Sequence, residues 1–191
     1  MRIANHAAMA VVLLLAGCAA GVNFVKPSDD QLVVGTSTQD SVLASLGKPN
    51  LKSTKVVNGE TLNMDTYAYA KVGGKAVFPG VTPARSLALV FKDGVLVEKG
   101  YSSSFKQDNT YFDVDKAKTI KPGMSAEAVV ALLGHPSGEA IYPVSSTKGN
   151  RNMEYVFGET KGFKSQRNSL IVEVGADGKV VKSDYTQVGQ L

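Results

Sequence analysis

The chain has 191 residues, with 21 Lys or Arg against 17 Asp or Glu, so its formal net charge is +4. This charge is too small to favour a nucleic-acid-binding protein, and a hydrophobic content of 43% is typical of a folded globular protein. Because there is one cysteine, no internal disulfide bond can form.

The first segment has the three parts of a signal peptide. Arg2 supplies positive charge, an apolar run extends from Ala7 to about Ala16, and small residues lead into Cys18. The run is shorter than the roughly 20 residues that a membrane-spanning helix needs. The sequence Leu15-Ala16-Gly17-Cys18 resembles the lipobox of bacterial lipoproteins, [LVI]-[AST]-[GA]-C, at every position.

This resemblance implies cleavage after Gly17, diacylglycerol on the sulfur of Cys18 and an N-acyl chain such as palmitate on the new terminus. We therefore predict a lipoprotein signal peptide over residues 1–17 and a lipidated tether over residues 18–27, with no cofactor besides the covalent lipid. The alternative is a buried structural cysteine behind an ordinary secretory signal. Ala19 stands where lipoproteins retained in the inner membrane commonly have Asp. The resemblance thus favours the outer membrane. We expect the protein to face the periplasm, although the sequence leaves a cell-surface orientation open.

The rest of the chain carries the same pattern twice. The two copies lie at residues 35–49 (GTSTQDSVLASLGKP) with 86–101 (SLALVFKDGVLVEKGY), and at residues 123–136 (GMSAEAVVALLGHP) with 169–185 (SLIVEVGADGKVVKSDY). Two matches in the same order indicate two modules, which we place at residues 28–105 and 111–187. An extended tether from Cys18 to about Lys26 spans at most roughly 30 Å, so the first module is expected close to its membrane.

Each copy predicts two short helices and three strands. Thr38 and Ser125 can cap helices that Gly47 and Gly134 end, and their apolar residues recur at three-to-four spacing. Shorter helices are predicted before these, at residues 28–33 and 113–120. Strands are predicted at residues 65–70, 87–91, 95–97, 153–157, 170–174 and 180–181, with Asp-Gly turns at 93–94 and 177–178. The predicted fold class is α+β: two tandem ααβββ modules, each an antiparallel sheet with helices packed on one face. The sequence leaves open whether the two sheets are continuous.

These patterns resemble the SmpA/OmlA (BamE-like) family of outer-membrane lipoproteins, most closely in the second copy at Ile120-Lys-Pro-Gly-Met-Ser, Leu133-Gly-His-Pro and Tyr155-Val-Phe. The resemblance implies a non-catalytic protein that supports outer-membrane assembly or envelope integrity through protein contacts, with the β-barrel assembly machinery as a candidate partner. The tandem arrangement is more similar to the β-lactamase inhibitory proteins. It suggests an alternative function, inhibition of a periplasmic or secreted enzyme.

No catalytic or metal-binding constellation is evident. His135 is the single histidine after Cys18, and the other copy has Lys48 at the same turn position, so we interpret it as an exposed turn residue. Without a second histidine or a free cysteine, we expect neither a zinc site nor a cysteine nucleophile. We predict that the protein is not an enzyme.

The candidate functional residues lie in two basic loops, one in each module, which we expect at the same end of each module as a two-lobed contact surface. The candidates are Lys71, Lys75, Phe78 and Arg85 in the first loop and Lys161, Phe163, Lys164 and Arg167 in the second. Cations around an apolar tip suit an acidic protein surface or anionic lipid headgroups. The alternative is that these are solvated hairpin loops whose lysines serve solubility.

Overall fold

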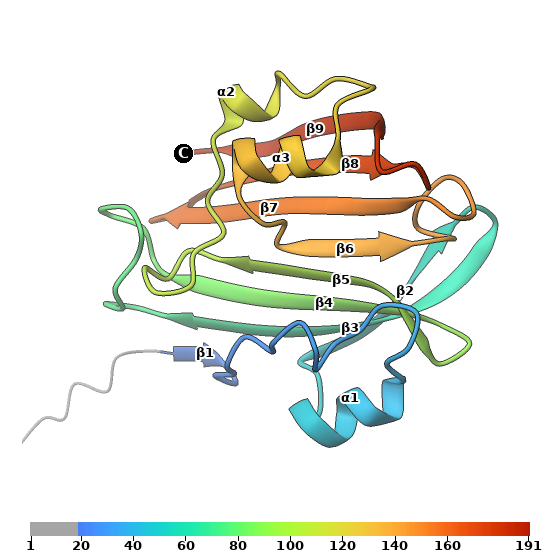
Figure 1. Ribbon diagram of the computed structural model, residues 1–191. Coiled ribbons are helices and arrows are strands. Elements are labelled where there is room, and N and C mark those ends of the chain that lie inside the picture. Colours follow the sequence, from blue (N-terminus) through green and yellow to red (C-terminus); the bar gives the residue numbers. More distant parts are fainter. Residues whose placement is uncertain (1–18) are drawn as a thin grey trace, which may run out of the picture.

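The computed structural model describes residues 19–191 (Figure 1), so the predicted signal peptide and Cys18 lie outside the described residues. The helices are α1 (Gln39–Leu46), α2 (Val114–Ala117) and α3 (Ala126–Leu133). The strands are β1 (Ala19–Gly21), β2 (Leu51–Val57), β3 (Glu60–Lys71), β4 (Ala84–Lys92), β5 (Val95–Ser103), β6 (Gly138–Ile141), β7 (Arg151–Lys161), β8 (Lys164–Val174) and β9 (Val180–Gln190).

All nine strands of the described chain form one antiparallel sheet, in the order β1-β3-β4-β5-β6-β7-β8-β9, with β2 paired to β3 beside β1. The predicted fold class is therefore wrong: the protein is mostly antiparallel β-sheet and not an α+β pair of ααβββ modules. Helices α1 and α3 have eight residues each and α2 has four, whereas β3, β7, β8 and β9 have 11 or 12. The two halves also share the sheet, because β6 connects β5 to β7.

Two further differences explain the error. Residues 28–33 form turns rather than a helix. The Gln31 side chain accepts a hydrogen bond from the Ser28 N–H (3.0 Å), which stabilises a turn between these two residues. Strands β2 and β6 were not predicted. For β2 a signal was present, since Asn58-Gly59 forms the turn to β3 with both residues at positive φ (50° and 78°), as an Asn-Gly hairpin requires.

The repeated residues occupy corresponding places in the two halves. The hydroxyl of Tyr67 in β3 donates to the Gly47 carbonyl after α1 (2.9 Å), and that of Tyr155 in β7 donates to the Gly134 carbonyl after α3 (3.0 Å). The pair Leu87↔Tyr101 in β4 and β5 corresponds to Leu170↔Tyr185 in β8 and β9. Tyr67 and Tyr155 thus each fix the end of a helix to the sheet.

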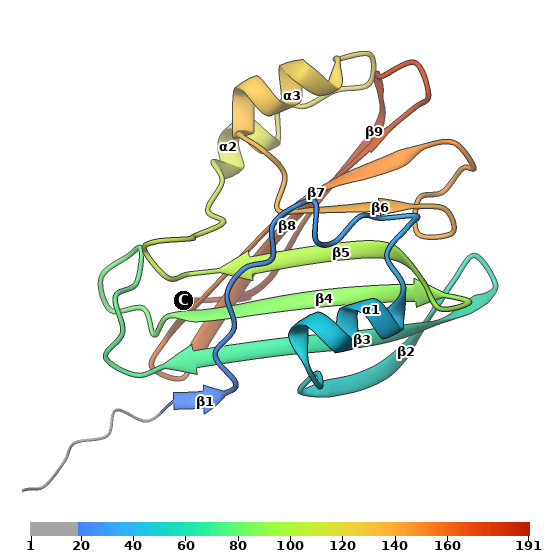
Figure 2. The same cartoon turned by 60° about the horizontal axis from the view of Figure 1, so that its bottom comes forward.

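The core lies mainly between the sheet and the helices, on what we call the helix side. One cluster packs Val42 of α1 against Leu87 and Leu89, and another packs Val129 of α3 against Leu170 and Val172. Figures 1 and 2 show α1 against the first half of the twisted sheet, and α2 and α3 against the second. We call the other side the open face. There a smaller cluster of Leu62, Val90 and Val97 lies toward the end of the sheet that carries the β2–β3 turn.

The segment expected as a free tether is bound to the sheet from its first described residue. Strand β1 pairs with the end of β3, and Phe24 packs edge-on against Tyr67 and Tyr101, with ring centroids 6.2 and 6.4 Å apart. The Arg85 guanidinium donates to the Phe24 carbonyl (3.0 Å). Among residues 19–27, little length remains that could act as a flexible linker.

Candidate functional site

The candidate site arises because β6 is too short to fill the space between β5 and β7. Strand β6 pairs with β5 only over residues 98–100 and with β7 only over residues 151–154. From Gly138 toward the end of the sheet where β3, β5 and β7 finish, no strand lies between β5 and β7. We call this region the seam. Gly138 permits the close approach at its start, since a Cβ there would lie 2.5 Å from the Lys99 carbonyl oxygen.

Two sets of hydrogen bonds close the seam without a strand. Thr110 donates its N–H to the Ser103 carbonyl (2.9 Å) and its hydroxyl to the Val156 carbonyl (2.6 Å), so one residue joins β5 to β7. Farther along, the Thr82 N–H in the β3–β4 loop donates to the Thr160 carbonyl in β7 (2.9 Å). The two halves are therefore fixed relative to each other at this end of the sheet.

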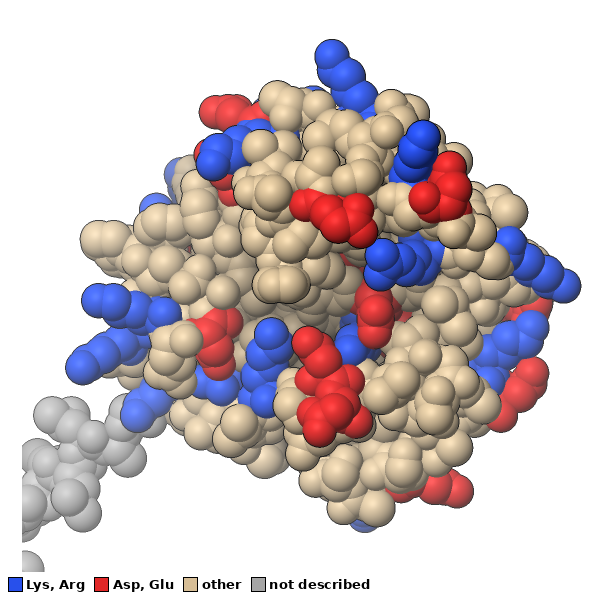
Figure 3. Space-filling view, viewed as in Figure 1, with Lys and Arg blue, Asp and Glu red and all other residues tan. Residues whose placement is uncertain are grey.

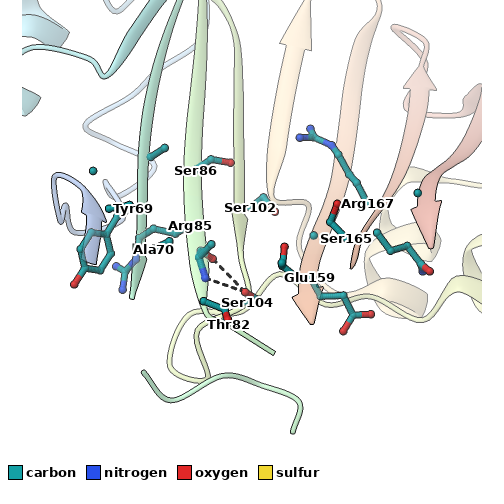
Figure 4. A pocket seen from close by; sticks show the side chains of 18 of the residues that line it. Tyr69, Ala70, Thr82, Arg85, Ser86, Ser102, Ser104, Glu159, Ser165 and Arg167 are labelled. Atoms are coloured by element: carbon teal, nitrogen blue, oxygen red, sulfur yellow. Dashed lines mark hydrogen bonds between the residues drawn. The ribbon is translucent and has the colours of Figure 1, made fainter. Parts of the chain in front are cut away.

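On the open face, the seam and its flanking strands form a hollow of about 610 Å³, which we call the trough (Figure 4). Its floor consists mainly of small residues, because alanine, serine and glycine occupy the outward positions of several neighbouring strands. These residues are Ala68, Ala70, Ala84, Ser86, Ser102, Ser104, Gly158 and Ser165. Larger side chains at these positions would fill the space.

The trough is also lined by polar and charged groups. The Ser104 hydroxyl accepts a hydrogen bond from the Ala84 N–H (3.0 Å) and donates one to the Ala84 carbonyl (3.3 Å). Backbone groups of Ala84 therefore occupy it both as an acceptor and as a donor. Arg167 lines the trough and has no ion-pair partner among residues 19–191. Over the same residues, no group of three His, Cys, Asp or Glu could hold a metal ion. Arg167 is therefore a cation of the trough that could contact a bound group.

A buried carboxyl lies on the same face. Glu154 of β7 is 6% exposed, and burial together with the nearby Glu98 carboxylate raises its pKa to about 8. Lys55 and Arg167 oppose this increase. Lys55 of β2 forms an ion pair with Glu98 across the open face. Glu154 is thus an uncharged acid near neutral pH, beneath a charged pair.

Most of the predicted contact residues are exposed. Lys71, Lys75, Lys161 and Lys164 lie at the surface, and Phe163, at the tip of the β7–β8 hairpin, is as exposed as an isolated side chain (110%). Arg167 is also exposed, but it belongs to β8 and faces the trough rather than a loop.

Two of the predicted contact residues have a structural role instead. Phe78 packs edge-on against Tyr111 and Phe157, with centroids 5.1 and 6.0 Å apart. Arg85 is a buried residue of β4 whose guanidinium pairs with Asp108 (3.1 Å) and lies over the Phe105 ring (4.4 Å from the centroid). Phe78 lies in the β3–β4 loop as predicted, whereas Arg85 lies in β4. The sequence did not reveal these contacts because the partners lie tens of residues away.

A second hollow, of about 320 Å³, lies on the helix side between the two halves. It is lined by His135 together with Lys99, Tyr101 and Glu139. Lys99 pairs there with Asp29 (3.3 Å) and Glu139 (3.1 Å). The histidine lies at the edge of a structural ion-pair network that joins the N-terminal segment to both halves.

The trough was not predictable from sequence motifs. Its residues are small and carry no motif, and the only available signal was the run of alanine and serine at alternate positions of 68–70, 84–86 and 102–104.

No protein-family model matches this chain, and no curated protein matches it. A solved structure of a protein named as a "putative beta-lactamase inhibitor protein", from Streptococcus mutans, is 16% identical in sequence. The similarity covers 83% of this chain and 91% of the other, with a TM-score of 0.43. A similarity at this level carries no conclusion about function.

Proposed function

We propose that this protein is a non-catalytic, lipid-anchored binding protein of the bacterial envelope that holds a segment of a partner protein in the trough. The observation that carries the proposal is the trough itself. It is a hollow of about 610 Å³ on the face that the helices leave uncovered, lined by side chains too small to fill it. A rigid, preformed cavity of this size is typical of a binding site.

The lining indicates what kind of segment would fit. Small floor residues leave room for the partner's side chains, and the unpaired Arg167 would favour an acidic or carbonyl-rich contact. The seam is also closed by hydrogen bonds, so binding would not need to reorganise the sheet. A pre-organised site loses less entropy on binding than a flexible one.

The lipid anchor rests on the lipobox at residues 15–18 and on the resemblance to outer-membrane lipoproteins. Within residues 19–191, no helix combines the length and apolar character needed to cross a membrane. Intact-mass measurement of the chain purified from membranes tests the anchor. We expect a mass that corresponds to cleavage after Gly17 with acyl chains on Cys18, and a Cys18→Ser variant that retains its signal peptide. An unmodified cysteine would contradict this part of the proposal.

Site-specific photo-crosslinking tests the trough. A photoreactive residue at Ser102, on the trough floor, should capture a partner in intact envelopes. The same residue at Thr61, which is exposed on β3 away from the trough, should not. Equal capture at the two positions, or capture at Thr61 alone, would contradict a binding site in the trough.

A filled trough gives an independent test. The double variant Ser86→Phe and Ser102→Phe should fold, since both positions are half-exposed, and should lose the partner, whereas Thr61→Phe should keep it. Mass spectrometry of the captured protein then decides between the two functions. A component of the β-barrel assembly machinery would support a role in envelope assembly, and a stoichiometric hydrolase would support inhibition of an enzyme. Turnover of an envelope substrate by the purified protein would contradict the non-catalytic assignment.

A further inference from the structure

Strand β1 fixes the start of the described chain to one end of the sheet. Its three residues pair antiparallel with the end of β3, as Ala19↔Lys71, Ala20↔Ala70 and Gly21↔Tyr69. The approach is close, because a Cβ at Gly21 would lie 2.1 Å from the Ala68 carbonyl oxygen. Cys18 is bonded to Ala19, and consecutive Cα atoms are 3.8 Å apart. A lipid on Cys18 would therefore begin at the end of the sheet where β3 finishes, which we call the anchor end.

The two predicted basic loops lie at this same end. Strands β3 and β7 both run toward it, and the hydrogen bond from the Thr82 N–H to the Thr160 carbonyl joins the loop that follows β3 to the end of β7. The Lys106 N–H donates to the Lys75 carbonyl (3.0 Å), which adds the segment after β5 to the same surface. Three separate parts of the chain thus meet around the point where the lipid would begin.

The anchor end carries unpaired positive charge. Five exposed lysines lie there, and none of them has an ion-pair partner within the described chain: Lys71, Lys75, Lys106, Lys161 and Lys164. Of the nearby acids, Asp108 is already paired with Arg85, and Glu159 remains. Figure 3 shows Lys and Arg side chains gathered at the left of the molecule, beside the start of the described chain. At the opposite end charges are mixed, with Lys92 paired to Glu60.

The same end also presents apolar tips. Phe163 projects from a two-residue turn with 110% exposure, and Val72, at the start of the β3–β4 loop, is 59% exposed. An exposed aromatic side chain on a hairpin tip, surrounded by lysines, matches the depth profile of a lipid headgroup region, in which aromatic rings and snorkelling cations are favoured.

From these observations we propose that the anchor end rests on an anionic membrane surface, with Phe163 and Val72 among the headgroups and the five lysines at the phosphate level. This inference rests on the lipid anchor of the proposed function and adds the orientation. The long strands then stand away from the membrane, and the trough, which lies at the same end, opens sideways just above the headgroups.

Tryptophan fluorescence can test this orientation, because the chain has no tryptophan. The full chain with Phe163→Trp is reconstituted into phosphatidylcholine vesicles with or without phosphatidylglycerol, which contain lipids brominated in the upper acyl chain. We expect a blue-shifted emission and strong quenching, both greater with phosphatidylglycerol. The matched control is Val56→Trp, an exposed valine (71%) near the β2–β3 turn at the opposite end. It should be quenched little in either lipid.

Paired charge variants test the contribution of the lysines. In the Phe163→Trp chain, Lys161→Gln with Lys164→Gln should remove about half or more of the phosphatidylglycerol-dependent quenching. Lys148→Gln with Lys179→Gln, the same charge change at the opposite end, should leave it unchanged. Equal quenching of the Phe163→Trp and Val56→Trp chains, or equal effects of the two charge pairs, would overturn the orientation. The intact mass reports the lipid anchor separately, so a failure of the orientation can be distinguished from a failure of the anchor.

Discussion

Replacing Glu154 with glutamine should stabilise the protein at alkaline pH. The carboxyl is 6% exposed, and burial followed by repulsion from Glu98 raises its pKa from 4.5 to about 8. In the folded protein it therefore keeps its proton at pH values where the unfolded chain has released it. The contribution of this carboxyl to the free energy of unfolding is fully present below about pH 4.5 and is lost as the pH rises toward 8. Each pH unit in this window costs about 1.4 kcal/mol, so the loss is about 4 kcal/mol at pH 8.

Glu154→Gln removes this titration while it preserves the shape of the side chain. We expect the variant and the parent chain to be about equally stable near pH 4.5 and the variant to be more stable at pH 8 by up to about 4 kcal/mol. Urea unfolding followed by far-ultraviolet circular dichroism at a series of pH values measures the difference. Glu159→Gln, on the same strand, is the control for loss of a carboxyl. If the stability of the parent and Glu154→Gln chains changed in parallel with pH, the assignment of a buried neutral acid would be wrong.

Four further substitutions, with two control variants, test the fold by urea unfolding. Tyr67→Phe and Tyr155→Phe should each lower the free energy of unfolding by about 1 kcal/mol, because each removes the hydrogen bond to the glycine carbonyl that ends a helix. The control Tyr111→Phe, with a half-exposed ring, should change it little. A loss in only one half would contradict the equivalence of the two tyrosines. Gly138→Ala should cost about 1–3 kcal/mol, because its Cβ would meet Lys99 and Gly100 backbone at 2.5 and 2.9 Å. In Gly158→Ala the nearest atoms would lie 3.9 Å from the new Cβ, so this substitution should be tolerated. Equal losses of stability in Gly138→Ala and Gly158→Ala would exclude steric crowding at the seam. Arg85→Met should lower the free energy of unfolding by about 3 kcal/mol, because it leaves Asp108 without its cation. Hydrogen exchange of residues 19–27 should also increase in this variant. Unchanged exchange would show that Arg85 does not hold this segment.

Local features of the fold were predictable from sequence. Thr38 and Ser125 cap α1 and α3 as predicted, each accepting a hydrogen bond from the backbone N–H three residues on, because a hydroxyl at that position satisfies a free donor whatever the rest of the chain does. The glycines that end both helices have positive φ (74° and 84°), which few other residues adopt at low cost. Such features depend on neighbours within four residues.

Features that depend on distant partners were not predictable. Arg85 looked like one of several loop cations, but its ion pair with Asp108 and its hydrogen bond to the Phe24 carbonyl exist only in the folded chain. The same holds for the continuous sheet, since the four residues of β6 carry too little pattern to reveal that they join two halves. The trough was missed for the opposite reason: it is defined by side chains that are small, and small residues give a weak signal.

The short β6 strand connects the fold to both proposals. If β6 extended along the whole of β5 and β7, the sheet would be closed at the anchor end, and Thr110 and Thr82 would have no carbonyls of β7 to bind. Because β6 begins only at Gly138, the seam beyond this residue must be closed by the β3–β4 loop and the segment after β5. These segments carry Lys75 and Lys106, so the shortness of one strand produces the trough and also gathers lysines beside the proposed lipid attachment point. A partner segment bound in the trough would then be held close to the membrane surface, within reach of proteins embedded in it.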